Sequence, residues 1–208
     1  ARLYSGGELF LHIGVTLYET VLGFVLGTAA GTLIAITLWW SPAINRVLDP
    51  YLVVLNALPK IALGPILIVW FGAGITSIIV MALLISFVVT IMSVLAGFNE
   101  ITGEKQLLMK TLGASKLQIF TMVVLPASLP TIMNALKISV GMSWVGVIVG
   151  EYLVSKAGLG YLIVYGGQVF KLDLVMASIV VLCLLAALMY YGVAYMEKKL
   201  VRWRMHGG

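Results

Sequence analysis

The chain has 208 residues, of which 62% are hydrophobic and only 10% are charged, with a net charge of +5. A soluble domain carries about 25% charged residues, and the mean hydropathy of this chain is +1.11. The composition excludes a soluble enzyme and a disordered chain, and it predicts an all-α integral membrane protein. The positive charge is typical of cytoplasmic loops in membrane proteins, so it does not indicate nucleic-acid binding.

Five segments are long and apolar enough to cross a membrane, for which a helix needs about 20 residues. In chain order they are residues 15–40, 49–71, 75–98, 129–154 and 174–196. The second segment is interrupted by Pro59, Lys60 and Pro65, and the glycines in residues 72–74 separate it from the third. We expect these five helices to form one transmembrane domain over residues 1–208.

Basic residues in the connections predict the orientation of the chain. Eight lie on the side that holds the third connection and the C-terminal tail, against three on the other side. The eight are Arg46, Lys105, Lys110, Lys116, Lys198, Lys199, Arg202 and Arg204; the three are Arg2, Lys156 and Lys171. Lys and Arg favour cytoplasmic loops. We therefore expect the C-terminus in the cytoplasm, Ala1 outside, and the protein in the cell (inner) membrane.

Two stripes of glycine indicate close helix packing. Gly23, Gly27 and Gly31 recur every four residues in the first segment, and Gly146 and Gly150 have the same spacing in the fourth. In lipid, small residues let helix backbones approach closely. The stripes predict packing within the chain, and a subunit interface is the alternative.

The connection over residues 99–130 is the long polar loop of the chain, and loops of this length usually have a function. Residues 104–112 carry leucines at helical spacing, and Gly113 suits a left-handed helix end. Residues 115–118, Ser-Lys-Leu-Gln, match a capping box that opens a second helix, which we expect to end at Leu125-Pro126. The helix pair predicts a cytoplasmic docking surface. The alternative is a helix lying on lipid headgroups.

Ionisable residues at membrane depth are functional candidates. Glu19 and Glu151 lie near the outer ends of their segments, where each is either a solvated or capping group or part of an outer gate. Lys137 is expected to extend to the inner interface. Lys60 is either a cytoplasmic flank or, if its segment begins near Asp49, a group near the midplane that attracts an anion.

The fourth segment has the highest concentration of Ser, Gly and Trp among the spans. Ser139, Ser143 and Trp144 are therefore candidates for lining a substrate path, although a serine hydroxyl can also be satisfied by its own helix. His12 and His206 lie near opposite ends of the chain, so no metal site is expected. The phosphate-binding loop Gly-x-x-x-x-Gly-Lys-Ser/Thr does not occur in the sequence, so we do not expect ATP binding by that means.

The loop resembles the signature of ATP-binding-cassette importer permeases. That signature reads Glu-Ala-Ala, three residues, Gly, nine residues and Ile-x-Leu-Pro; here Gly113 is followed by nine residues and Val-Val-Leu-Pro. Residues 58–65, 70–72, 110–115 and 158–160 are similar to the branch that imports nitrate, sulfonates, taurine and similar compounds. The resemblance covers residues 16–180. The chain departs from the signature at residues 107–109, which are Leu-Leu-Met, so its acidic contact is absent or is replaced by Glu104.

The resemblance implies a permease subunit that is not itself an enzyme and that carries a small anionic solute. It implies a second permease copy, two ATPase subunits that bind ATP and Mg, an external binding protein, and one more helix before this sequence. The residues it implies for ATPase coupling are Glu104, Leu107, Leu108, Met109, Gly113, Ala114, Ser115 and Pro126.

Two other functions are compatible with the composition. A self-contained channel or secondary transporter needs no capped helix pair in the cytoplasm, and a secondary transporter usually has an internal repeat, which we do not find here. A membrane anchor for a soluble complex would use the loop for docking only. The importer permease is therefore the favoured hypothesis.

Overall fold

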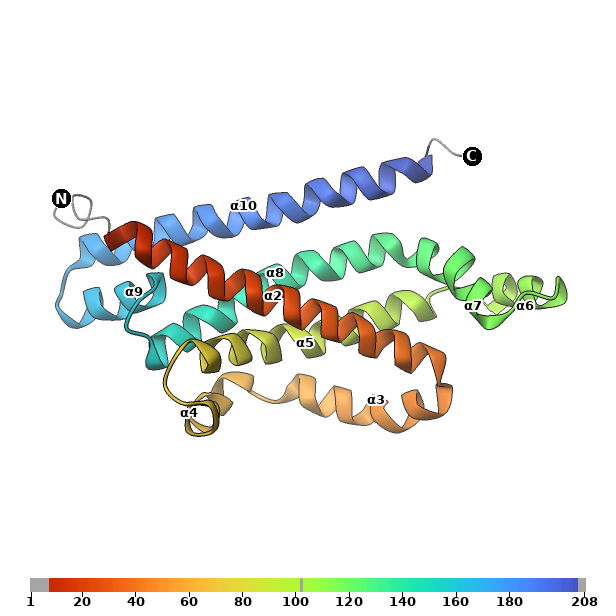
Figure 1. Ribbon diagram of the computed structural model, residues 1–208, viewed down its shortest axis with the longest axis horizontal. Helices are drawn as coiled ribbons and strands as arrows, with labels where there is room; N and C mark the ends of the chain where they lie inside the picture. The colour runs from red at the N-terminus through yellow and green to blue at the C-terminus, as the bar shows by residue number, and fades with distance from the viewer. Residues whose placement is uncertain (1–7, 102, 206–208) are drawn as a thin grey trace.

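The computed structural model describes residues 8–101 and 103–205, which are mainly helical and contain no β-strand. Ala1, Arg2 and His206, which entered the sequence predictions, lie outside these residues. The helices form an elongated bundle (Figure 1). In chain order they are α2 (Glu8–Trp40), α3 (Pro42–Ala57), η1 (Lys60–Leu63), α4 (Gly64–Phe71), α5 (Ile75–Asn99), α6 (Gly103–Thr111), α7 (Lys116–Ile119), η2 (Phe120–Val124), α8 (Leu125–Val154), α9 (Leu159–Gln168) and α10 (Leu172–Met205).

Four helical stretches are long and apolar enough to cross a membrane by themselves: α2, α5, the stretch that ends with α8, and α10. The second predicted span is not one continuous helix. It is a broken pair, α3 and the η1–α4 segment, bent by 85°. The break falls at Leu58, whose backbone is extended, because Pro59 disfavours a helical conformation in the residue before it. Five spans result only if this bent pair counts as one.

The fourth span is longer than predicted. Helical structure continues from Lys116 to Val154 over 39 residues, so the expected end at Leu125-Pro126 is wrong. The turn before the proline widens into the π-helix η2, in which the N–H group of Leu125 bonds to the carbonyl of Phe120. A wider turn of this kind accommodates a proline, which has no N–H group to donate and crowds the preceding turn.

Helix α5 lies between α2 and α8, with which it has the most extensive contacts in the structure. A Cβ atom at Gly23 would lie 2.7 Å from the Cβ atom of Ala82, and one at Gly146 would lie 2.5 Å from the Cα atom of Ala82. Gly31 and Gly150 approach Thr90 and Ile78 of the same helix in this way, and Gly27 approaches Ser86. Both glycine stripes therefore pack against α5 within the chain.

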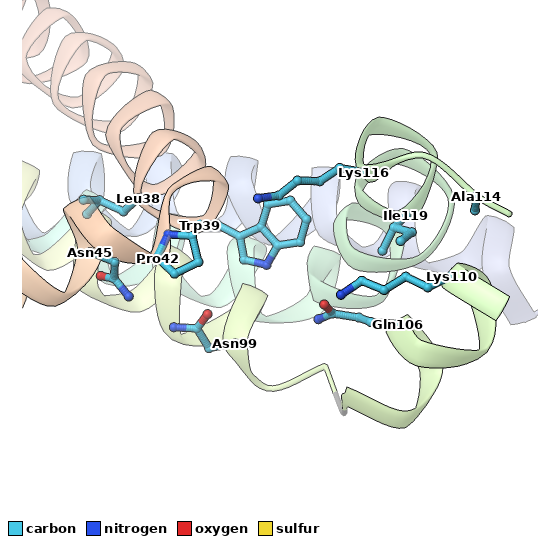
Figure 2. A pocket seen from close by; sticks show the side chains of 10 residues that line it. All are labelled: Leu38, Trp39, Pro42, Asn45, Asn99, Gln106, Lys110, Ala114, Lys116 and Ile119. Atoms are coloured by element: carbon cyan, nitrogen blue, oxygen red, sulfur yellow. The ribbon is translucent and has the colours of Figure 1, made fainter.

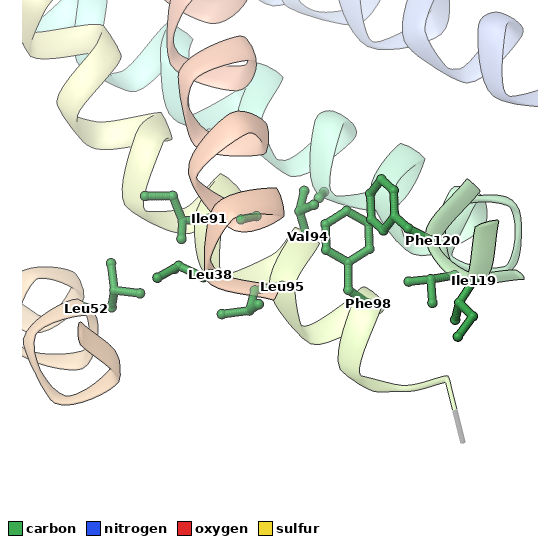
Figure 3. Packing of buried hydrophobic residues seen from close by; sticks show 11 residues of the cluster. Leu38, Leu52, Ile91, Val94, Leu95, Phe98, Ile119 and Phe120 are labelled. Atoms are coloured by element: carbon green, nitrogen blue, oxygen red, sulfur yellow. The ribbon is translucent and has the colours of Figure 1, made fainter. Parts of the chain in front are cut away.

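A core of buried side chains anchors the polar loop to one end of the bundle (Figure 3). Phe98 at the end of α5 is fully buried, and its ring lies 5.5 Å from that of Phe120, centroid to centroid. Phe120 also packs 4.9 Å from Trp39 of α2. The loop helices are thus held against the spans by aromatic packing.

The two ends of the bundle differ. Helices α6 and α7 lie at the same end as the last turns of α10, whereas α9 and the start of α2 lie at the opposite end (Figure 1). Helix α9 was not predicted, because its ten residues are too few for a span and the glycines before it indicated only a turn. Two helices lie at the periphery of the bundle. Leu52 is the buried residue of α3, and only 11% of the most apolar stretch of α10 is buried.

Candidate functional site

Helix α6 ends in the left-handed turn that the sequence predicts. Gly113 has φ +80°, a conformation in which a residue with a Cβ atom is strained. The N–H group of Gly113 bonds to the carbonyl of Lys110 at 3.0 Å, and that of Ala114 to the carbonyl of Met109 at 3.0 Å. This pair of bonds is a Schellman motif, which satisfies the last carbonyl groups of the helix.

The predicted capping box follows directly. The N–H group of Ser115 bonds to the side-chain oxygen of Gln118 at 2.8 Å, and the N–H group of Gln118 bonds to the hydroxyl oxygen of Ser115 at 3.3 Å. These reciprocal bonds begin α7 two residues after the glycine turn. The end of α6 is therefore fixed by hydrogen bonds within the backbone, and the start of α7 by hydrogen bonds between backbone N–H groups and side chains.

Helix α6 presents an apolar face outwards. The side chains of Leu107 and Leu108 are 62% and 61% exposed, and that of Leu112 is 74% exposed. Glu104 is exposed on the same helix. Met109 was expected on this face, but it is only partly exposed and packs inwards against the buried core. Leu112 takes its place, and its helical spacing from Leu108 already indicated that it shares a face.

At the other end of the bundle, two carboxyl groups are buried next to each other. Glu19 on α2 and Glu151 on α8 are 0% and 1% exposed, so the interpretation of either as a solvated group is wrong. The two carboxyl groups are close enough for their charges to interact, yet neither oxygen of Glu19 has a hydrogen-bond partner in the described part of the chain. A proton on one of the two carboxyl groups would supply the donor for this contact.

Glu151 connects three helices. One of its oxygens accepts a hydrogen bond from the hydroxyl group of Thr16 on α2 at 2.6 Å, and the other accepts one from the N–H group of Gly160 on α9 at 2.5 Å. The N–H group of Leu159 bonds in turn to the Thr16 hydroxyl oxygen at 2.7 Å. A carboxylate at the N-terminus of α9 stabilises that helix, because its first N–H groups lack partners within the helix.

The Gly-Leu-Gly stretch of the sequence fits around this carboxylate. A Cβ atom at Gly158, where φ is +118°, would collide with the Glu151 carboxyl group, and one at Gly160 would lie 2.8 Å from its oxygen. The N–H group of Gly158 bonds to Nδ1 of His12 at 2.8 Å. Thr16 and His12 were missed in the sequence, since their partners are 135 to 146 residues away along the chain.

The two lysines of the spans have close partners. Lys137 lies 3.0 Å from Glu197 of α10, so it forms an ion pair within the bundle where a side chain extended to the interface was predicted. Lys60 lies in η1 at the bend of the broken span, and its Nζ atom donates to the carbonyl of Asn56 at 3.1 Å.

The α8 residues predicted to line a substrate path point into the chain. Ser139 and Ser143 are fully buried, and Ser139 shares a hydrogen bond of 2.7 Å with Thr90 of α5. Trp144 is 4% exposed and packs against α10. In the chain on its own, neither serine faces an open cavity. Among the exposed side chains of α8, those of Asn134, Ile138, Met142 and Val145 lie on a different stripe.

No group of three or more His, Cys, Asp or Glu side chains arranged for a metal ion occurs within residues 8–101 and 103–205.

Comparison with known proteins agrees with these features. The taurine transport system permease protein TauC of Escherichia coli is 30% identical over 98% of this chain and 74% of its own length. The putative aliphatic sulfonates transport permease protein SsuC of Bacillus subtilis is 32% identical, with the same coverage of both chains. Among solved structures, the inward-facing MetNI methionine ABC transporter has a chain with the same fold, at a TM-score of 0.73 and 20% identity over 93% of this chain and 94% of that chain.

A family described as binding-protein-dependent transport system inner membrane component matches residues 23–202. Its members are membrane components of ABC importers and not enzymes, since the ATPase is a separate subunit. Nothing in the comparisons supports a self-contained channel or a secondary transporter. The chain therefore belongs to the family of binding-protein-dependent transport system inner membrane components, as the permease subunit of an ATP-driven importer.

Proposed function

We propose that this permease imports a small organic or inorganic anion, of the class of taurine, alkanesulfonates and nitrate. The names of two relatives, the taurine and aliphatic sulfonate permeases, support this substrate class. In this proposal the whole chain acts as one transmembrane domain, with residues 99–130 as its cytoplasmic coupling loop and the C-terminus on the same side of the membrane.

The observation that carries the coupling role is the apolar face of α6. Leu107 and Leu108 are exposed on a short helix whose direction is fixed by the Schellman motif and the capping box, and Leu112 is exposed in the turn that follows it. Exposed apolar residues on a rigid polar loop are favourable contacts for a hydrophobic groove of another protein. The partner we propose for this face is the importer's ATPase subunit. Two such subunits would serve two permease copies.

The substrate path would lie between two copies of the chain. The exposed α8 stripe and the outer face of the broken span offer apolar surface to a second copy, and Lys60 at the bend is a basic group that would attract an anion. Ser139, Ser143 and Trp144 lie directly behind the exposed stripe. We propose that these three residues hold α8 in position along the wall of the substrate path.

The opposite end would receive substrate from an external binding protein. Glu151 joins α2, α8 and α9 at that end, which supports its proposed role in the outer gate. Opening this end requires α9 to separate from Thr16 and Glu151. The hydrogen bonds of these groups therefore set part of the energy of the closed state.

Uptake by the reconstituted importer tests the proposal. Permease, ATPase and binding protein are placed in liposomes with ATP inside, and uptake of radiolabelled taurine is measured in competition with ethanesulfonate and nitrate. We expect saturable uptake that needs ATP. Failure of all three anions to enter or compete would overturn the substrate class.

The double variant Leu107→Glu/Leu108→Glu tests the coupling face in the same assay. We expect it to lose uptake and to lose the ATPase during purification, since two charges replace the apolar contact. Leu200→Glu is the matched control, because Leu200 is an exposed leucine near the end of α10. Wild-type uptake by the double variant would show that α6 is not the coupling element.

A further inference from the structure

A polar cavity lies where the loop helices meet the corner between α2 and α3, and its volume is about 410 Å³. Small-molecule sites usually measure about 300–1,000 Å³. Figure 2 shows its lining side chains grouped around the ring of Trp39. The lining residues are Leu38, Trp39, Pro42, Asn45, Asn99, Gln106, Lys110, Ala114, Lys116 and Ile119.

The cavity has a positive charge. Lys110 and Lys116 line it, and no Asp or Glu does. Lys116 is held in place, because its Nζ atom donates to the carbonyl of Trp40 at 2.5 Å and lies 5.6 Å from the ring centroids of Trp39 and Trp40. Lys110 forms no ion pair or side-chain hydrogen bond with any described residue. One fixed and one free ammonium group favour an anion.

The uncharged polar groups add a second requirement. Asn45, Asn99 and Gln106 contribute side-chain amides, whose NH₂ groups donate to oxygen atoms of a ligand. The side-chain oxygen of Asn45 is buried and accepts no hydrogen bond from the described residues. A buried acceptor without a donor is costly. A ligand that fits must therefore carry a hydroxyl or similar donor beside its negative group.

The position of the cavity indicates where such a ligand would come from. Trp39 and Trp40 end a membrane-spanning helix, and tryptophan is enriched at the membrane–water interface. Basic pockets beside transmembrane helices on the cytoplasmic side bind phosphate headgroups of lipids. The cavity is open on one side and lies at the end of the bundle that holds the loop.

We propose that this cavity binds a phosphate ester that carries a free hydroxyl group, with the phosphate between Lys110 and Lys116 and the hydroxyl donating to Asn45. Phosphatidylglycerol of the cytoplasmic leaflet and soluble glycerol 3-phosphate both have this chemistry. The bound group would contact the α2–α3 corner and both loop helices. Access from the cytoplasmic side rests on the orientation given under the proposed function.

Lipid binding to the purified permease–ATPase complex tests the site. Native mass spectrometry counts bound short-chain phosphatidylglycerol against phosphatidylcholine of equal chain length, with glycerol 3-phosphate as a competitor. We expect at least one bound phosphatidylglycerol in preference to phosphatidylcholine. Lys110→Gln should weaken that binding about fivefold, the effect of one basic residue at an anionic lipid surface.

Two further variants make the result specific. Asn45→Leu keeps the size of the side chain but removes its polar atoms, and it should also weaken binding. Lys198→Gln is the matched control, since Lys198 is an exposed lysine of α10 that does not line the cavity. Retention of the ATPase by Lys110→Gln and Asn45→Leu would show that the complex is intact.

Each outcome decides one point. Two outcomes support the site and assign it to the soluble ester. One is displacement of the lipid by glycerol 3-phosphate; the other is binding of glycerol 3-phosphate when phosphatidylglycerol is not preferred over phosphatidylcholine. Binding of both probes by Lys110→Gln and Asn45→Leu at wild-type level overturns the site, as does binding of neither probe by the wild type. Cysteine labelling that places residue 110 outside the cytoplasm overturns the orientation, while lipid binding still decides the site.

Discussion

Thr16 on α2 and Glu151 on α8 lie 135 positions apart in the sequence, and a hydrogen bond of 2.6 Å joins their side chains. The Thr16 hydroxyl oxygen accepts a bond from the N-terminus of α9, and so does the other oxygen of Glu151. Two spans and one short helix are thus connected through two buried side chains. Loss of either side chain leaves buried polar groups without hydrogen-bond partners. A substitution at either position should therefore lower the stability of the folded protein.

Glu151→Gln should destabilise this end of the bundle. A carboxamide has only one acceptor oxygen, so one of the donors, Thr16 or Gly160, would face an NH₂ group. We expect a loss of about 1–3 kcal/mol, seen as a lower Tm in detergent and as altered uptake in proteoliposomes.

Glu19→Gln provides the matched comparison. Its carboxamide is neutral and has an NH₂ group available to donate to Glu151, so it removes one of two neighbouring like charges. We expect a Tm equal to or above that of the wild type. An equal decrease in Tm for Glu19→Gln and Glu151→Gln would contradict different roles for the two carboxyl groups.

Gly113→Val should uncouple ATP hydrolysis from transport. A β-branched residue at φ +80° costs about 1–2 kcal/mol, which is enough to change the direction of α6 relative to α7. ATPase activity, uptake and co-purification of the ATPase are measured in reconstituted complexes.

We expect uptake in Gly113→Val to fall while the spans remain folded. Gly192→Val is the control, because Gly192 is an exposed helical glycine with open space around its Cβ position. All three readouts at wild-type level would exclude the Gly113 turn from coupling.

Gly146→Ala should lower stability by about 1–3 kcal/mol, as overpacking does in a close-packed interior. The added methyl group would lie 2.5 Å from the Cα atom of Ala82, so α5 and α8 would have to separate. Gly14→Ala, on α2 with nothing within 4 Å, is the comparison. Thermal unfolding followed by circular dichroism measures both, and equal Tm values would argue against close α5–α8 packing.

Labelling from each side of the membrane tests the orientation. Single cysteines are introduced at positions 116 and 156 in a Cys183→Ser background, since Cys183 is the only cysteine of the chain. An impermeant thiol reagent added outside intact cells should reach position 156 and leave position 116 unmodified. Labelling of both positions from the same side would refute the proposed topology.

Local patterns in the sequence predicted the loop and the spans well. The Gly113 turn and the Ser115 capping box depend on residues within a few positions of each other, so the sequence contains all the information they need. The apolar runs of α2, α5 and α10 are similarly local, because burial in lipid requires a continuous apolar stretch. The bend at Leu58 was indicated by Pro59, although a single span was predicted across it.

Features that depend on distant contacts could not be predicted. Met109 was expected on the docking face, and only the fold reveals the core that it enters. Glu19 and Glu151 looked like the solvated ends of spans, and only the packing of the distant helices shows that both are buried. Lys137 likewise gains a partner, Glu197, that is 60 residues away.

The unbroken helical stretch from Lys116 to Val154 connects the two candidate sites mechanically. It starts at the loop proposed to contact the ATPase and carries Glu151 near its far end, and the 30 residues of α8 alone span about 45 Å at 1.5 Å per residue. The glycines of α8 pack closely against α5, which supports α8 as a rigid element. A tilt of α8 by about 5° at its loop end would displace its far end by about 4 Å, given that length. In the proposed orientation, a nucleotide-driven movement of the loop would thereby reach the external end of α8 as a tilt of the helix, with no change in its secondary structure.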